Sequence, residues 1–321
     1  MADDHQSLLS HALSMVRHNK RYLFWFWVLN LTLAEFGTAA FRKSAHALMD
    51  HSLYSINLLQ RFDISVFGEL LSNPRFGPVA SASTPAMYFA FLYFAATALF
   101  LPGVFSGYAS NYRLPRDEFF RSCGRNLWRF VRLILISALV LGTVVGVLFS
   151  LNEGIVKKAA ESTNELLPIE LRMVGLTLIF LVMTTVRIWF DLAEVDIVLA
   201  DQRAVRKAIS AGFRHTFRRL ASLLASYVLT SILSIIVLIA GLFVWMKLVS
   251  PQSVVGAFVV AQVISYLMLI PRFWQRAVAV TYWQRNMLIP VAAIPPIAPT
   301  PVPVAPPAFA DSPANPAVSN S

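Results

Sequence analysis

Charged residues are scarce in this chain of 321 residues, where they account for 14% against 57% apolar residues. An ordinary soluble domain carries about 25% charged residues, so the composition excludes that class of protein. Cysteine is scarce as well. The single Cys123 excludes an intramolecular disulfide and argues against a metal site built from cysteines. We expect Cys123 to be a small packing residue within a helix.

The sequence motifs of soluble enzymes are also missing. The chain contains no H-E-x-x-H, no Walker A sequence, no G-x-S-x-G and no G-x-G-x-x-G. His46, Asp50 and His51 suggest a zinc site by their residue types. Only His46 and Asp50 share a helical face, and no second cluster completes a tetrahedral set. The sequence therefore predicts no metal, no cofactor and no soluble-type catalysis.

The chain does contain six long apolar stretches of 17 to 25 residues. A helix rises 1.5 Å per residue, so each stretch is long enough to cross about 30 Å of hydrocarbon. The stretches are Tyr22–Phe41, Met87–Tyr108, Leu133–Leu151, Leu171–Trp189, Ala221–Trp245 and Val254–Ile270. They predict an all-α fold, a polytopic transmembrane bundle of six spans. We interpret two G-x-x-x-G pairs, Gly103 with Gly107 and Gly142 with Gly146, as faces for close packing inside it.

Basic residues are unevenly divided between the loops. When those at span ends are counted with the adjoining loops, 19 of the 27 Lys and Arg fall in the N-terminal segment, the second and fourth loops and the C-terminal segment. The positive-inside rule then places both termini in the cytoplasm. The net charge of +10 is thus a topological signal rather than a sign of nucleic-acid binding. We expect a multi-pass protein of the bacterial inner (plasma) membrane with no nucleic-acid partner.

The sequence divides into three parts. Residues 1–21 form a cytoplasmic N-terminal segment, and residues 22–289 form the six-span domain, with an external segment at 42–85. From residue 290 onward, 10 of the 32 residues are proline and none is Lys or Arg. This composition predicts a disordered cytoplasmic tail, 290–321, of polyproline II character.

Both of the longer cytoplasmic loops place cations along one side of a helical pattern and apolar residues along another. The pattern predicts amphipathic elbow helices on the inner membrane surface, where each cation near anionic headgroups contributes about 1 kcal/mol. The expected lipid-interface residues are Arg121, Arg125 and Arg129 in the first loop and Arg203, Lys207, Arg214 and Arg218 in the second. Anionic membrane lipids are therefore the predicted partners.

The second of these loops resembles a known class of membrane proteins. Arg187 is followed by Asp196, by Asp201-Gln202-Arg203, and by Lys207-Ala208-Ile209-Ser210 before a basic, aromatic run and a new span. Over about 40 of the 321 residues, this arrangement resembles uncharacterised bacterial multi-pass membrane proteins related to the membrane domain of glycerophosphodiester phosphodiesterases. The resemblance implies a bundle of spans with a short cytoplasmic elbow helix. It implies no phosphodiesterase activity, because the chain has no soluble phosphodiesterase domain.

Ionisable residues inside the spans are the strongest candidates for function, because an unpaired charge in hydrocarbon is costly. Glu35 lies about two-thirds of the way through the first span, either in a polar crevice or protonated and hydrogen-bonded to a neighbouring helix. Arg187, Asp191 and Glu194 share one helical face at the end of the fourth span. They form either a polar site that faces the bundle interior or an ion pair that clamps the following loop.

Three classes of function are compatible with this pattern. In an accessory or structural membrane protein, the charges serve topology and packing alone. In a permease, they line a wet path near Glu35 and the face of Arg187, Asp191 and Glu194. A lipid-modifying enzyme requires acids or histidines clustered at one interface, which the sequence offers only in the rejected zinc group. We therefore expect a non-enzymatic accessory or structural component, with a permease as the alternative. Either a membrane-protein partner or a homo-oligomer is compatible with the sequence.

The basic asymmetry generates a prediction about orientation. A reporter that is active only outside the cytoplasm should be active when fused near Ser162, in the third loop, and silent near Ser210, in the fourth. The two fusions are compared at equal expression in a bacterial inner membrane. The opposite pattern of activities would overturn the orientation with both termini inside.

Overall fold

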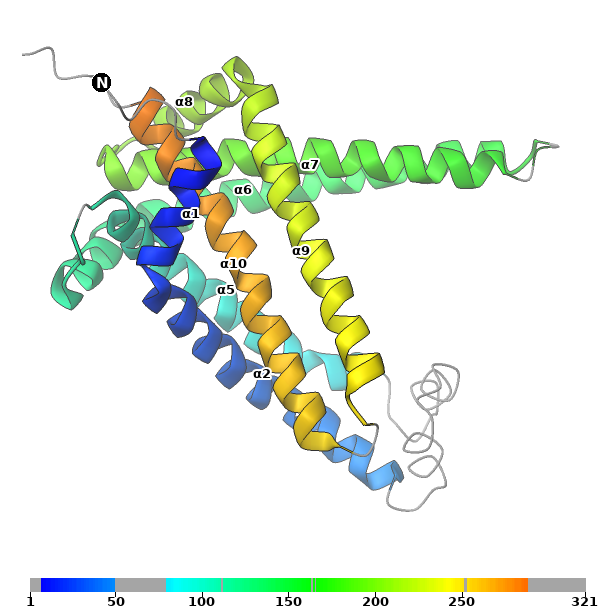
Figure 1. The fold of residues 1–321 in the computed structure, drawn as a ribbon. Coiled ribbons are helices and arrows are strands. Elements are labelled where there is room, and N and C mark those ends of the chain that lie inside the picture. Colours follow the sequence, from blue (N-terminus) through cyan, green and yellow to red (C-terminus); the bar gives the residue numbers. More distant parts are fainter. Residues whose placement is uncertain are drawn as a thin grey trace, which may run out of the picture. The chain divides into compact units, whose positions relative to one another are not determined.

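Helices account for the regular structure of this chain. The computed structural model describes residues 7–49, 79–110, 112–162, 164, 166–250 and 253–287, and within these ranges it contains helices and no strands. The helices are α1 (Leu8–His18), α2 (Lys20–Met49), α5 (Val79–Ala109), α6 (Arg116–Ala159), α7 (Leu167–Leu199), α8 (Val205–Arg218), α9 (Leu220–Leu248) and α10 (Val254–Asn286). The fold class is all-α (Figure 1). The expected tail, 290–321, and most of the expected external segment lie outside the described residues.

Five of the described helices are long and apolar enough to cross a membrane. They are α5, over Met87–Ala109, together with α6, α7, α9 and α10. The chain thus has the helices of a multi-pass membrane protein. α2 contains the first expected span, Tyr22–Phe41, and is not among the five, which were identified from the described residues alone.

α6 differs from the sequence expectation at its beginning. The predicted first elbow and the predicted third span, Leu133–Leu151, belong to one unbroken helix that begins at Arg116 and ends at Ala159. The joining segment holds no proline, and an internal glycine such as Gly124 costs a helix only about 1 kcal/mol. The prediction of a separate elbow helix in the first cytoplasmic loop is therefore wrong. α8, in contrast, is a separate amphipathic helix between α7 and α9.

α6 and α7 form a long antiparallel hairpin (Figure 1). Asn152 of α6 is buried, and its side chain fills the space where a Cβ on Gly175 of α7 would lie. Glycine at this position therefore lets the two helices approach closely about two turns from the loop that joins them.

α1 is a helix that the sequence analysis did not predict. Ser7 caps the amino end of α1, because the Ser7 Oγ accepts a hydrogen bond from the amide of Ser10 at 3.2 Å. Ala12 and Val16 are buried, and the indole of Trp274 in α10 donates to the Leu9 carbonyl at 3.0 Å. The apolar residues of this segment recur at helical intervals, so the pattern was present in the sequence. α1 therefore packs on α10 and is part of the bundle.

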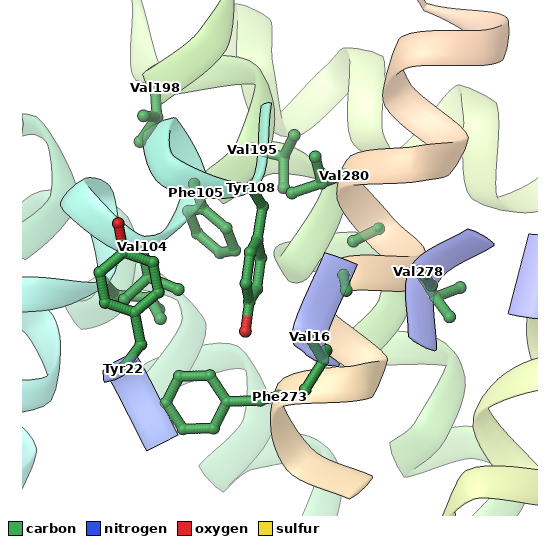
Figure 2. Packing of buried hydrophobic residues seen from close by; sticks show 14 of the residues in the cluster. Val16, Tyr22, Val104, Phe105, Tyr108, Val195, Val198, Phe273, Val278 and Val280 are labelled. Atoms are coloured by element: carbon green, nitrogen blue, oxygen red, sulfur yellow. The ribbon is translucent and has the colours of Figure 1, made fainter. Parts of the chain in front are cut away.

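The largest apolar core is rich in aromatic side chains (Figure 2). Tyr22 of α2 stacks on Phe119 of α6 with ring centroids 5.5 Å apart. These two side chains occupy the spaces that Cβ atoms on Gly107 and Gly103 of α5 would fill, so this first glycine pair does serve internal packing. The buried Cys123 also packs beside Gly103.

The second glycine pair differs from the expectation. No atom lies within 4 Å of the Cβ positions of Gly142 and Gly146, so this face of α6 is turned away from the other described helices. The internal packing interpretation was wrong for this pair, because α6 contacts α7 through other residues, such as the buried Asn152, which fills the space beside Gly175.

α8 lies against α7 through small residues. Ala208, Gly212 and Thr216 are its buried residues, and they recur every four positions. The indole of Trp189 in α7 donates to the Ile209 carbonyl at 2.7 Å. A Cβ on Gly212 would lie 2.7 Å from the Trp189 carbonyl oxygen, which as a backbone atom cannot move aside cheaply. The absence of a side chain at Gly212 therefore sets how closely α8 approaches α7.

This contact predicts opposite effects for two Gly→Ala substitutions. Gly212→Ala should lower the free energy of unfolding by about 1–2 kcal/mol, since overpacking outweighs the gain in helix propensity. Gly154→Ala is the control, because nothing lies within 4 Å of its Cβ position, and it should leave stability unchanged or raise it by up to about 1 kcal/mol. Unfolding in detergent micelles provides the measurement. A Gly212→Ala protein as stable as the wild type would contradict the close contact.

Candidate functional site

A buried carboxylate lies where α7 meets α9. Asp191 is 8% exposed, and its Oδ2 accepts a hydrogen bond from the Tyr227 hydroxyl at 2.8 Å. The Nε of Arg187, one turn earlier on α7, lies 3.9 Å from the same oxygen. A buried charge is stable only when it is paired and hydrogen-bonded, and these two side chains supply both interactions.

The contacts continue from α9 to α10. Gln275 of α10 is buried, and its amide donates to the Tyr227 carbonyl at 3.3 Å and to the Ser231 hydroxyl at 3.0 Å. Ser231 in turn donates to the Tyr227 carbonyl at 2.8 Å. The tyrosine thus contacts α7 through its side chain and α10 through its backbone. Asp191, Tyr227 and Gln275 connect three helices.

Glu194 brings a second acid to this region, and Arg276 of α10 a second base. Glu194 interacts electrostatically with Asp191, Arg276 and Arg187. The Arg276 guanidinium also lies 5.4 Å from the centre of the Phe273 ring. Two carboxylates and two guanidinium groups therefore lie in one region of the bundle. We call Arg187, Asp191, Glu194, Tyr227, Gln275 and Arg276 the polar cluster.

A further polar contact joins α7 to α10. The indole of Trp283 donates to Asp196 Oδ1 at 3.1 Å, and both side chains are at least nine-tenths buried. Asp196 is one of the residues that carry the family resemblance described above. In this fold its carboxylate joins two helices.

Glu35 does not belong to the polar cluster. It is exposed on α2, and its carboxylate lies 3.0 Å from Arg42 Nη2 on the same helix. Arg42 also donates to the Glu35 carbonyl at 3.2 Å. Among the described residues, the structure thus brings Arg187, Asp191 and Glu194 together but leaves Glu35 apart from them.

The seven basic residues expected at the lipid interface fall into two groups. Arg129 donates to Asp201 Oδ1 at 2.6 Å, and this hydrogen bond lowers the pKa of Asp201 below its ordinary value. Asp201 has a φ of 49°, a left-handed conformation that Asp tolerates better than most residues, just after the end of α7. The other six, Arg121, Arg125, Arg203, Lys207, Arg214 and Arg218, are exposed.

Sequence reasoning missed the partners on α9 and α10. Tyr227 lies in a long apolar run, where a single hydroxyl does not stand out. Gln275, Arg276 and Trp283 lie beyond the last expected span, Val254–Ile270, on the part of α10 that continues to Asn286. A glutamine followed by an arginine in a continuing helix was the available signal.

Comparisons with protein-family models, with curated proteins and with solved structures found no match. The resemblance to membrane domains related to glycerophosphodiester phosphodiesterases therefore stays a prediction. In the described ranges, no three His, Cys, Asp or Glu side chains gather as a metal ion would require.

Proposed function

We propose that this chain is a non-enzymatic accessory or structural component of the bacterial inner membrane. In this proposal α2 is the first of six spans, and both termini are cytoplasmic. Five span-like helices and the uneven distribution of basic residues support it. α8 serves as the cytoplasmic elbow, with anionic lipids near its exposed cations.

The observation that supports this proposal most strongly is that side chains of the polar cluster interact with one another across helices. The Asp191 carboxylate is occupied by Tyr227 and Arg187, and Glu194 interacts electrostatically with Arg276 and Arg187. The pairing of Asp191 joins helices and leaves little of its charge for a solute to bind. The cluster acts as a clamp between α7, α9 and α10.

The apolar exterior supports a role in the membrane. The outer parts of α6, α7 and α9 expose large apolar side chains that no described helix covers, and such surfaces are typical of contact with lipid or with other membrane helices. On α9 they include Leu229, Ile232, Ile235, Ile236, Ile239 and Phe243. α8 likewise exposes Phe213 and Phe217 beside its cations, the arrangement of an interfacial helix.

A permease remains the second candidate, because Glu194 and Arg276 are ionisable groups on apolar helices. A transport path has to be reachable from both sides of the membrane in turn, whereas a clamp does not. Access from the two sides therefore separates the two functions.

The test is the labelling of a thiol introduced by Glu194→Cys in a chain that also carries Cys123→Ala. A Ser162→Cys protein serves as the control for one side of the membrane. A membrane-impermeant maleimide added on that side should label this control but not the Glu194→Cys thiol, because the clamp stays closed toward that side. Ser210→Cys, exposed on α8, is the control for the opposite side. Labelling of the Glu194→Cys thiol from the side of Ser162 would favour the permease.

A further inference from the structure

A basic cleft lies where α1 and the C-terminal end of α10 meet the beginning of α9. Its volume is about 400 Å³, within the range of small-ligand pockets. The lining residues are Leu8, Arg219, Ser222, Tyr282, Arg285 and Asn286. Two of these side chains are guanidinium groups, three carry hydroxyl or amide groups, and no acid is among the described lining residues.

The first turn of α9 adds further positive character. α9 begins at Leu220, directly after Arg219, and no side chain caps its amino end. Its first turn contains no acid and contributes Ser222 to the cleft. The unpaired amide groups at the start of a 29-residue helix carry a partial positive charge. The cleft thus borders a helix end that favours anions.

A further basic side chain, Arg218, lies near the cleft. Arg219 and Arg218 both interact electrostatically with Tyr282, whose hydroxyl donates to the His215 carbonyl at 3.3 Å. Partial burial and the nearby Arg218 lower the pKa of His215, although Asp196 acts in the opposite direction. Three described guanidinium groups, those of Arg218, Arg219 and Arg285, therefore lie in or near the cleft.

We propose that this cleft binds the phosphate group of a phosphoester lipid headgroup or of free inorganic phosphate. Guanidinium groups pair with phosphate oxygens through two parallel hydrogen bonds, and the Ser222 hydroxyl is a further donor in the cleft. The Asn286 amide donates to the Tyr282 carbonyl at 3.1 Å and has a second hydrogen to donate. The cleft also lies at the ends of two span-like helices, α9 and α10, which is the level of headgroups in a bilayer. The site extends beyond the proposed structural role and holds for either orientation in the membrane.

The test uses the full chain, purified in detergent and freed of bound lipid. Calorimetric titration measures the dissociation constants of short-chain phosphatidylglycerol and of inorganic phosphate. The double variant Arg219→Gln/Arg285→Gln should weaken binding about tenfold or more. Arg113→Gln/Arg116→Gln removes the same charge from exposed positions at the start of α6, outside the expected lipid interface, and should change binding less than about twofold.

A third variant, Ser222→Trp, fills the cleft while keeping both arginines. It tests whether the cleft is the binding site even if the double variant does not fold. It should also weaken binding about tenfold. Competition between the two ligands shows whether the site prefers a lipid headgroup or free phosphate. Displacement of the lipid by millimolar phosphate indicates a site for free phosphate, whereas retention of the lipid indicates a headgroup site. Three results would overturn the proposal, namely no binding of either ligand to the wild type, equal weakening by both charge-removing pairs, or unchanged binding in the Ser222→Trp protein.

Discussion

The burial of the Asp191 carboxylate is the constraint on which the arrangement of α7, α9 and α10 depends. A carboxylate with so little exposure requires fixed donors, and Tyr227 from α9 supplies the shortest of them. The backbone of the same tyrosine accepts from Gln275 of α10. The position of α9 is thus set from two sides, which the non-directional packing of apolar side chains alone would not achieve.

The second half of α7 is the element around which the other helices gather. From Ile188 to Val198 every residue is buried except Trp189 and Glu194. This segment meets α8 through Gly212 and α10 through the bond between Asp196 and Trp283. The first half of α7 instead shares its hairpin with α6 and exposes much of its apolar surface. One helix therefore combines a buried, polar anchor with an apolar arm suited to lipid or to other membrane helices.

Helical content and most apolar spans could be predicted from the sequence, because length and hydropathy act locally along the chain. The i, i+4 spacing likewise placed Arg187 beside Asp191. Tyr227 and Trp283 could not be assigned as partners, since they lie 36 and 87 residues away from their carboxylates and only the tertiary fold brings them near. The unbroken α6 was missed because a change from amphipathic to apolar pattern was interpreted as a helix boundary, although no proline ends the helix there.

The central claim, that the Tyr227–Asp191 hydrogen bond joins α7 to α9, is tested most directly by a double-mutant cycle. Tyr227→Phe, Asp191→Leu and the combined variant are compared with the wild type by their free energies of unfolding in detergent. Asp191→Leu removes the contact with Arg187 in both backgrounds, so that contribution cancels. We expect a coupling energy of about 1.5–3 kcal/mol, typical of a hydrogen bond to a charged group. Effects that add to within about 0.3 kcal/mol would contradict the claim.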